Sequence, residues 1–189
     1  MFLVIGLGNP DQKYQYSRHN IGFRIVDHLS EQNQWKWNET KRFQWCHGKI
    51  SNQEIYLVKP LTYMNQSGLG LLSFLSYIAK SFKKKIIVHD ELDLPPGRIR
   101  ISCGGGAAGH KGVLSIAEYC NLETFIRVRV GIGKPLHKDE ITEYVLFEPS
   151  SDEAAILAES EKRSVEALIC IVTHGVQYAM NRFNSISAT

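Results

Sequence analysis

The sequence predicts an α/β protein in which a mixed, largely parallel β-sheet is enclosed by helices. Short apolar runs typical of strands alternate along the chain with segments of helical periodicity. Of the 189 residues, 43% are hydrophobic and 22% are charged, as in an ordinary soluble globular protein. No repeat, low-complexity stretch or long linker divides the chain, so a single domain over residues 1–189 is expected.

Five apolar runs predict strands, and a sixth over 43–50 is a weaker candidate. The five cover 2–5, 54–59, 85–89, 98–102 and 126–132. Apolar residues three or four positions apart predict helices over 21–32, 67–80, 111–120 and 151–182. Within the last of these, Gly175 is expected to bend or interrupt the helix.

Charge and cysteine usage exclude several classes of protein. The formal net charge of +3 permits an anionic partner without requiring one. No apolar run reaches the roughly 18 residues of a membrane span, and the N-terminus lacks a secretion signal, so a cytoplasmic protein without a membrane partner is expected. The four cysteines form no CxxC pair, which predicts free thiols and no zinc site.

The stretch IGLGNP resembles the start of a dinucleotide-binding domain but lacks its decisive features. That fingerprint requires a third glycine where this chain has Asp11. Pro10 has no backbone N–H to offer a phosphate, and no helix begins at once. Gly6 and Gly8 are therefore expected to form a sharp turn that displays Asn9 at the end of the strand.

Four further polar segments fall at positions where an α/β sheet gathers its functional residues, beyond the carboxyl ends of strands. They are SRHN at 17–20, KPLTYMNQSG at 59–68, HDELDLPPG at 89–97 and CGGGAAGHKG at 103–112. Each also has a purely structural interpretation. Ser17, Asn20 and Asn65 can cap helices, and the glycine-rich segment can be a surface connection.

The acidic segment allows one further alternative, a divalent-cation site formed by Asp90, Glu91 and Asp93. Strand alternation places His89 and Asp90 on opposite faces of the sheet, so these two are not expected to be joint ligands. The glycine-rich segment is no Walker loop, because it lacks GK[ST].

Taken together, these segments resemble the bacterial-type peptidyl-tRNA hydrolases. The resemblance covers nearly the whole chain, from VIGLGNP to RVGIGKP at 129–135. It implies an enzyme that hydrolyses the ester between a peptide and the terminal ribose of tRNA, recycling tRNA from peptides released prematurely from ribosomes. It also implies no cofactor, no metal, a monomeric state and a mixed sheet enclosed by helices.

The resemblance assigns the central roles to four residues. His19 matches the histidine that activates water, and Asp90 matches the aspartate that holds this histidine in the useful tautomer. Asn9 and Asn65 match residues that fix the peptide and the ester. The residue chemistry independently favours His19, because histidine is the side chain suited to act as a base near neutral pH.

The other expected substrate contacts face the tRNA. Tyr14 and Tyr63 match positions lining the tRNA acceptor end, and Met64 matches a wall of the cleft. His110 and Lys111 lie where the family loop reads Gly-His-Asn, and a lysine in place of the asparagine cannot accept a hydrogen bond.

A basic pair clamps the 5′ phosphate of tRNA in many family members. Arg129 matches one member of that pair, but Ser102 stands at the position of the other. Arg100 or Lys111 can compensate. Arg127 and Arg129 are two positions apart on a predicted strand and so share a face, as do Arg98 and Arg100.

Two other classes of function make different demands on the sequence. An RNA-binding protein without catalysis would have lost His19 or Asp90, and both are present. A nucleotide-dependent oxidoreductase requires the missing third glycine.

Overall fold

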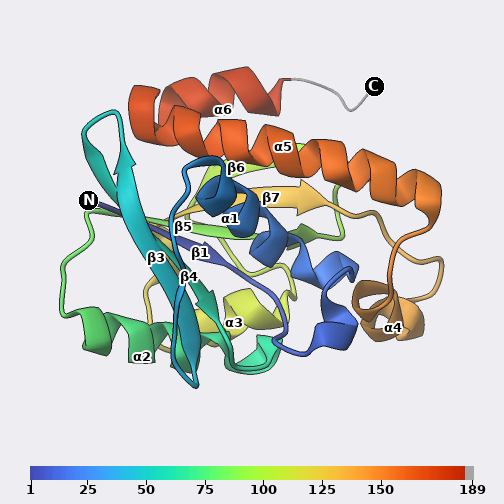
Figure 1. The fold of residues 1–189 in the computed structure, drawn as a ribbon. Coiled ribbons are helices and arrows are strands. Elements are labelled where there is room, and N and C mark those ends of the chain that lie inside the picture. Colours follow the sequence, from blue (N-terminus) through green and yellow to red (C-terminus); the bar gives the residue numbers. More distant parts are fainter. Residues whose placement is uncertain (186–189) are drawn as a thin grey trace.

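The computed structural model describes residues 1–185, so the last four residues of the expected domain over 1–189 lie outside the described residues. One sheet joins seven strands in the order β2-β3-β4-β1-β5-β7-β6 (Figure 1). In chain order the strands are β1 Phe2–Gly6, β2 Asn38–Glu39, β3 Phe43–Ile50, β4 Gln53–Pro60, β5 Lys84–Glu91, β6 Ile99–Cys103 and β7 Phe125–Gly131.

The centre of the sheet is parallel and its edges are antiparallel. Strands β4, β1, β5 and β7 run in the same direction, whereas β3 and β2 at one edge and β6 at the other pair antiparallel. The central strands are buried on both faces, which explains why β1 and β5 are continuous apolar runs rather than alternating ones. The predicted mixed sheet is confirmed.

Helices cover both faces of the sheet (Figure 1). Helices α1, α5 and α6 lie on one face, α2 and α3 lie on the other, and the short α4 lies beyond the carboxyl end of β7. Their bounds are α1 Ile21–Gln32, α2 Ser67–Ile78, α3 Lys111–Ala117, α4 Ile141–Leu146, α5 Ser151–His174 and α6 Val176–Asn184.

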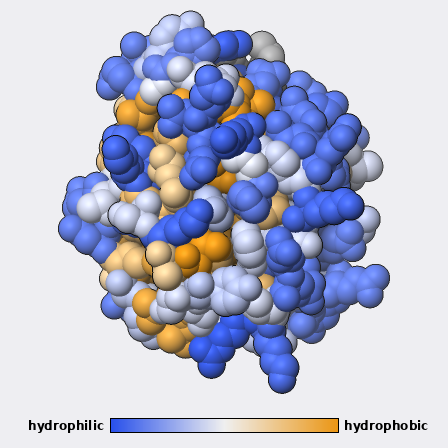
Figure 2. All heavy atoms as spheres, turned by 60° about the vertical axis from the view of Figure 1, so that its left-hand side comes forward, coloured by the Kyte–Doolittle hydropathy of each residue, from blue (hydrophilic) through white to orange (hydrophobic). Residues whose placement is uncertain are grey.

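Two hydrophobic clusters hold these layers together, one on each face of the sheet. Val4, Val88 and Val128 belong to the cluster under α1 and α5, whereas Ile5 and Ile87 belong to the cluster under α2 and α3. On the face shown in Figure 2 the hydrophobic residues form an irregular band left of the centre, and the right-hand side is mostly hydrophilic. In residues 1–185 no helix combines the length and the apolar character needed to cross a membrane.

Most predicted elements are confirmed, and the exceptions are short. Gly175, with φ of 87°, divides the predicted helix over 151–182 into α5 and α6. Strand β2, helix α4 and a 3₁₀ turn at Gln12–Tyr14 were not predicted from the sequence. Elements of two to six residues contain too few periodic positions to be distinguished from loops.

The glycines of the first loop have a different purpose from the predicted one. Residues 7–9 form neither a turn nor a bend, so the predicted sharp turn is wrong, and neither Gly6 nor Gly8 has a positive φ. A Cβ at Gly8 would lie 2.6 Å from the ring of Phe23, and one at Gly22 would lie 2.5 Å from the backbone nitrogen of Leu7. These glycines let α1 pack closely against the end of β1, and the loop still displays Asn9 there.

Candidate active site

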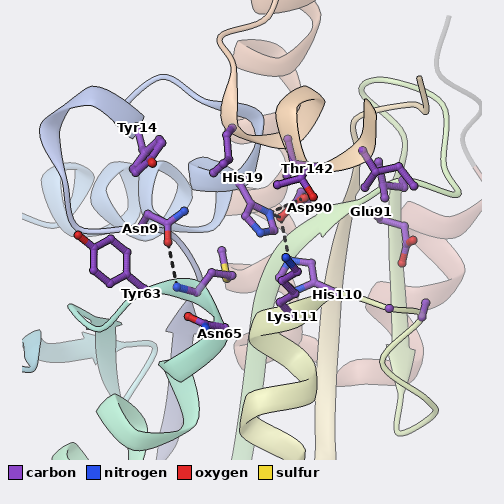
Figure 3. A pocket seen from close by; sticks show the side chains of 17 residues that line it. Asn9, Tyr14, His19, Tyr63, Asn65, Asp90, Glu91, His110, Lys111 and Thr142 are labelled. Carbon is purple, nitrogen blue, oxygen red and sulfur yellow. Dashed lines mark hydrogen bonds and ion pairs between the residues drawn. The ribbon is translucent and has the colours of Figure 1, made fainter. Parts of the chain in front are cut away.

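A cavity of about 450 Å³ opens beyond the carboxyl ends of β1, β4 and β5 (Figure 3). The residues predicted as site residues line it, except Arg129: Asn9, Tyr14, His19, Tyr63, Met64, Asn65, Asp90, His110 and Lys111. Three of the four segments that supply them lie at the carboxyl ends of the parallel strands β1, β4 and β5, which meet at this edge of the sheet. The fourth, with His110 and Lys111, follows the antiparallel strand β6, which ends at the opposite edge, so the prediction that this segment begins beyond the carboxyl ends of the parallel strands is wrong.

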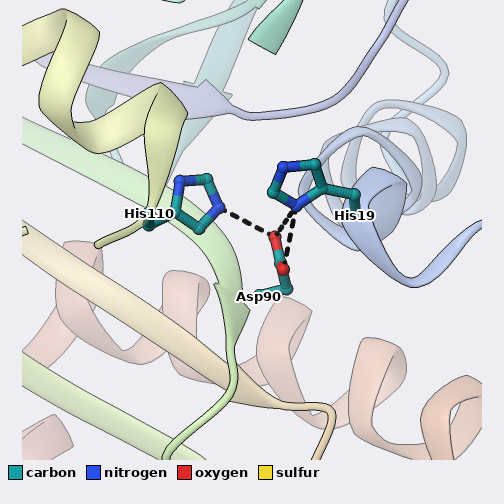
Figure 4. A group of neighbouring side chains, drawn as sticks. All are labelled: His19, Asp90 and His110. Carbon is teal, nitrogen blue, oxygen red and sulfur yellow. Dashed lines mark hydrogen bonds and ion pairs between the residues drawn. The ribbon is translucent and has the colours of Figure 1, made fainter. Parts of the chain in front are cut away.

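At the base of the cavity, one carboxylate joins two imidazoles (Figure 4). Nδ1 of His19 lies 2.9 Å from both carboxylate oxygens of Asp90, and Nε2 of His110 lies 2.8 Å from Oδ1. All three side chains are at least nine-tenths buried. His19 lies in a 3₁₀ turn just before α1 and is only 7% exposed.

The surroundings keep the Asp90 carboxylate ionised. Burial alone would raise its pKa, but His19 and His110 outweigh burial through their charges and hydrogen bonds and hold the pKa well below the usual range for an aspartate. Both imidazoles therefore face a carboxylate, which can only accept hydrogen bonds.

The backbone of α3 fixes the tautomer of His110. Nδ1 of His110 accepts hydrogen bonds from the backbone nitrogens of Gly112 at 3.1 Å and Val113 at 3.3 Å, capping the helix. The proton of a neutral His110 must then sit on Nε2, where it is donated to Asp90. His19 donates its Nδ1 proton to the same carboxylate, which leaves the Nε2 lone pair of His19 free.

A third histidine, His89, lies beneath this group. Its ring centre is 4.7 Å from that of His110, and its Nδ1 lies 2.6 Å from the backbone oxygen of Asp90. The side chain points to the other face of β5 from Asp90, as strand alternation predicts, and makes no contact with that carboxylate. Burial, and then the neighbouring His110, lower the pKa of His89 well below its ordinary value.

This buried histidine is expected to make the protein less stable in mild acid. The unfolded chain binds a proton at His89 below about pH 6.5, whereas the folded chain does not, so stability is fully present above that pH and is lost as pH falls. The loss is up to about 1.4 kcal/mol per pH unit. Asp90 contributes in the same sense only below about pH 4.

Urea unfolding of wild type and His89→Asn at pH 7.5 and pH 5.5 measures this effect. The variant should lose less stability between the two pH values than wild type does, whereas the exposed control His137→Asn should behave as wild type. An equal loss in wild type and His89→Asn would exclude His89 as the source.

Asn9 is held in place by hydrogen bonds that leave the Nδ2 group of its side-chain amide available to a ligand. Its Oδ1 accepts a hydrogen bond from the backbone nitrogen of Met64 at 2.9 Å, and its backbone is bonded on both sides by the side chain of Asn20. Among the described residues, nothing bonds to Nδ2 of Asn9. Asn20 thus fixes the loop and makes no capping bond to α1, contrary to one structural interpretation of the sequence.

The remaining predicted contacts form the rim of the cavity. Tyr63 is half exposed and donates from its hydroxyl to Asp11 at 3.1 Å, while Tyr14 lies above Asn9 (Figure 3). Asn65 and Lys111 are exposed, and neither side chain has a hydrogen-bond or ion-pair partner in the part of the chain described. Both are free to meet a ligand.

The arginines expected to meet tRNA lie beside this cavity, at the β6–β7 edge of the sheet. Arg129 is directly opposite Arg100 in the antiparallel register, and Arg127 is opposite Ser102, so all four side chains share one face. Nε of Arg129 donates to Glu91 at 2.8 Å, and Glu91 itself lines the cavity. Arg98 instead contacts the backbone of Asn184 in α6.

The three acidic residues considered as a cation site face different partners. Asp90 faces the two imidazoles, Glu91 pairs with Arg129, and Asp93 pairs with Lys134. The structure therefore does not bring them together.

Another group with metal-ligand chemistry is His19, Asp90 and His110, whose ligand atoms lie within 4.8 Å of one another. Their hydrogen bonds account for these distances. Because Nδ1 of His110 already accepts from the helix backbone, a metal at Nε2 would have to displace the proton that bonds to Asp90. The donor set therefore fits a hydrogen-bonded network better than an ion.

One wall of the cavity, and the residue that holds it, were not predicted from the sequence. Ile141, Thr142, Val145 and Leu146 of α4 form this wall. Arg18, buried next to His19, donates to the backbone oxygens of Tyr144, Phe147 and Glu148 and to the Glu153 carboxylate. The available signal was the acidic pair Asp139–Glu140 before a short apolar segment, typical of a helix start.

Comparison with known proteins agrees with this geometry. A family model described as peptidyl-tRNA hydrolase matches residues 3–189. Peptidyl-tRNA hydrolases of Shouchella clausii and Thermodesulfovibrio yellowstonii are 38% and 37% identical over 97% and 98% of this chain and all of their own length. A crystal structure of peptidyl-tRNA hydrolase from Acinetobacter baumannii, 31% identical, superposes with a TM-score of 0.92 over 100% of this chain and 97% of that one. The chain therefore belongs to the peptidyl-tRNA hydrolase family.

Proposed function

We propose that this hydrolase cleaves the ester between a peptide and the terminal ribose of tRNA, recycling peptidyl-tRNA released prematurely from ribosomes, with His19 as general base. The observation that carries the assignment of the base is the 2.9 Å bond from Nδ1 of His19 to the ionised Asp90 at the base of the cavity. A base, a group that orients it and an adjacent space for substrate are what ester hydrolysis by water requires.

The reaction includes two proton transfers, one from water to His19 and one from His19 to the ribose oxygen. Nε2 of His19 removes a proton from water as the water oxygen attacks the ester carbonyl carbon. The positive charge that forms on the imidazole is stabilised by Asp90. When the tetrahedral intermediate collapses, the bond between carbon and ribose oxygen breaks, and the proton on Nε2 passes to that oxygen.

Two amides are suited to hold the acyl group during these steps. Nδ2 of Asn9 is a fixed donor, since Met64 restrains the other end of the amide. It serves the ester carbonyl, whose oxygen becomes negative in the intermediate. Asn65 offers both a donor and an acceptor to the peptide backbone.

Phosphate contacts are assigned to the shared face of β6 and β7. Glu91 binds Nε of Arg129, and within residues 1–185 no group bonds to the two terminal nitrogens of that guanidinium, which remain for a phosphate. Arg100 lies opposite and is exposed, which makes it the better replacement for the basic residue absent at Ser102. Tyr14 and Tyr63 at the rim are assigned to the terminal nucleotide, Met64 and the ring of His110 to the cavity wall.

Removal of a phosphate contact should appear in the salt dependence of the reaction. Arg129→Ala is expected to raise KM and to reduce the slope of log(kcat/KM) against log[salt] by about 0.7–0.9, because one fewer counterion is released on binding. The exposed Lys162→Ala on α5 is the matched control and should leave the slope unchanged. An unaltered slope in Arg129→Ala would show that this arginine makes no phosphate contact.

Lys111 is expected to act on binding rather than on the chemical step. Its ammonium has no partner among residues 1–185 and lies at the start of α3, from which a flexible side chain reaches outward to phosphate. Lys111→Asn should therefore raise KM a few-fold and weaken the salt dependence by about one phosphate contact, without changing the pH profile of kcat. A shifted pH profile with unchanged KM would instead place the ammonium beside His19.

One comparison of substrates tests the activity itself. The enzyme should release the amino acid rapidly from N-acetyl-aminoacyl-tRNA and only slowly from unblocked aminoacyl-tRNA. Binding of both without release would favour an RNA-binding protein. The proposal includes a monomer in the cytoplasm, and light scattering should give the mass of a single chain.

A further inference from the structure

A second cavity, of about 410 Å³, adjoins the catalytic one and shares Asn9 with it. The hydrogen bond from Tyr63 to Asp11 joins a residue of the catalytic cavity to a residue of the second one. We propose that this second cavity binds the residues of the peptide that precede the one esterified to tRNA. This inference rests on the proposed function.

The floor of the second cavity is a buried polar pair set among aromatic rings. Lys59, only 8% exposed, donates to Asp27 at 2.6 Å, and its ammonium lies 4.4 Å from the ring centre of Trp37. Phe23 supplies an apolar surface beside them. A donor, an acceptor and an apolar surface together match a peptide residue, which presents C=O, N–H and a side chain.

The walls add amides that lack partners. Gln12 and Gln15 belong to the loop after β1, and neither side chain makes a hydrogen bond within the described residues. A primary amide both donates and accepts, so it can bond to a peptide backbone without selecting the sequence. A site that must accept many nascent peptides needs this kind of contact.

The charge of the second cavity disfavours nucleic acid. Asp11, Asp27 and Glu31 line it. Against these three carboxylates stand two cations of the lining, Lys59, paired with Asp27, and Arg24, bonded at 2.7 Å to Glu161 outside the lining. The lining thus carries one more negative than positive charge.

The other side of the catalytic cavity has the opposite character, because Arg100 and Lys111 are exposed there, beside Arg129, which shares its charge with Glu91. The electrostatic field of these charges therefore orients the substrate: the polyanionic tRNA lies on the basic side, and the peptide is directed past Asn9 into the second cavity.

Variation of the peptide length distinguishes the contributions of the two cavities to substrate binding. An extended chain advances about 3.3 Å per residue, so a tetrapeptide reaches about 10 Å farther from the ester than a single amino acid does. Longer peptides should thus gain affinity from the second cavity alone.

The experiment compares N-acetyl-aminoacyl-tRNA with tetrapeptidyl-tRNA. Wild type should show a kcat/KM about tenfold higher for the tetrapeptide, equivalent to about 1.4 kcal/mol of added binding. Gln44→Trp, which fills the second cavity from β3, should abolish this gain and leave the N-acetyl substrate unaffected. Gln53→Trp, an exposed position on β4 outside both cavities, is the matched control and should keep the gain.

Other outcomes would overturn the inference. If Gln44→Trp retains the gain with peptide length, the peptide does not occupy the second cavity. Retained turnover of the N-acetyl substrate shows that the variant is folded. Failure of wild type to cleave either substrate would contradict the proposed function itself, so the two failures are distinguishable.

A charge series gives an independent check. Tetrapeptides with Lys at their N-terminal position should be cleaved faster than those with Glu, and Glu31→Gln should reduce this preference whereas Glu159→Gln, exposed on α5, should not. A preference that is absent in wild type, or unchanged in Glu31→Gln, would count against a peptide in this cavity.

Discussion

His19→Ala is expected to lower kcat by about 10²–10⁴-fold on N-acetyl-aminoacyl-tRNA, with tRNA binding retained. The variant removes the free Nε2 that accepts the proton of water, but it touches neither the arginine face nor the rim of the cavity. Single-turnover measurements with saturating enzyme isolate the chemical step from binding. KM and the salt dependence should remain near those of wild type.

A matched histidine variant makes this result specific. His47→Ala, on the exposed face of β3, should keep wild-type turnover. Near-normal kcat in His19→Ala would remove His19 from the mechanism and transfer the role of base to another group. Thermal unfolding of both variants shows whether either substitution disturbs the fold.

Much of the site could be predicted because the sheet topology brings its residues together. Asn9 and Asp90 end neighbouring parallel strands, and parallel strands deliver their ends to one edge of a sheet. The apolar runs 2–5 and 85–89 were recognisable from composition alone. Once these runs are known to be parallel, the polar residues that follow them must be neighbours, although His19 and Asp90 are 71 residues apart in sequence.

The remaining contacts depend on side-chain geometry that no periodicity encodes. His110 was expected as a substrate contact, yet both of its ring nitrogens are used, one by the α3 backbone and one by Asp90. The bond from Arg129 to Glu91 requires the register of β5 against β7, which the sequence does not specify. Arg18 binds backbone carbonyl groups of a segment more than 120 residues away. Because every residue has such a carbonyl, the sequence does not indicate which ones Arg18 binds.

Asp90 is the residue on which these contacts converge. Three distances of 2.8–2.9 Å join its two carboxylate oxygens to Nδ1 of His19 and Nε2 of His110, and both of these ring nitrogens donate a proton. A group that only accepts is therefore required. The two imidazoles respond differently to a replacement of Asp90. The α3 backbone fixes the tautomer of His110, so His110 always needs an acceptor at position 90, whereas the tautomer of His19 is set by the group at position 90 itself.

Asp90→Asn should therefore reduce kcat by about 10³–10⁴-fold while the fold survives. His110 must still donate from Nε2, so the amide oxygen is expected at the Oδ1 position beside both rings, which puts the amide NH₂ at the Oδ2 position, 2.9 Å from Nδ1 of His19. Nδ1 of His19 then has to accept, which moves its proton to Nε2 and removes the base. The loss of the carboxylate also leaves the forming imidazolium without its counter-charge.

A double variant separates this tautomer effect from simple loss of charge. In Asp90→Asn combined with His110→Asn, the fixed donor is gone while asparagine still caps α3. The amide at position 90 can then turn its oxygen toward His19 and restore the useful tautomer. Turnover should recover about tenfold relative to Asp90→Asn alone, a non-additivity that a double-mutant cycle measures. A double variant slower than Asp90→Asn would show that His110 does not control the orientation of the group at position 90.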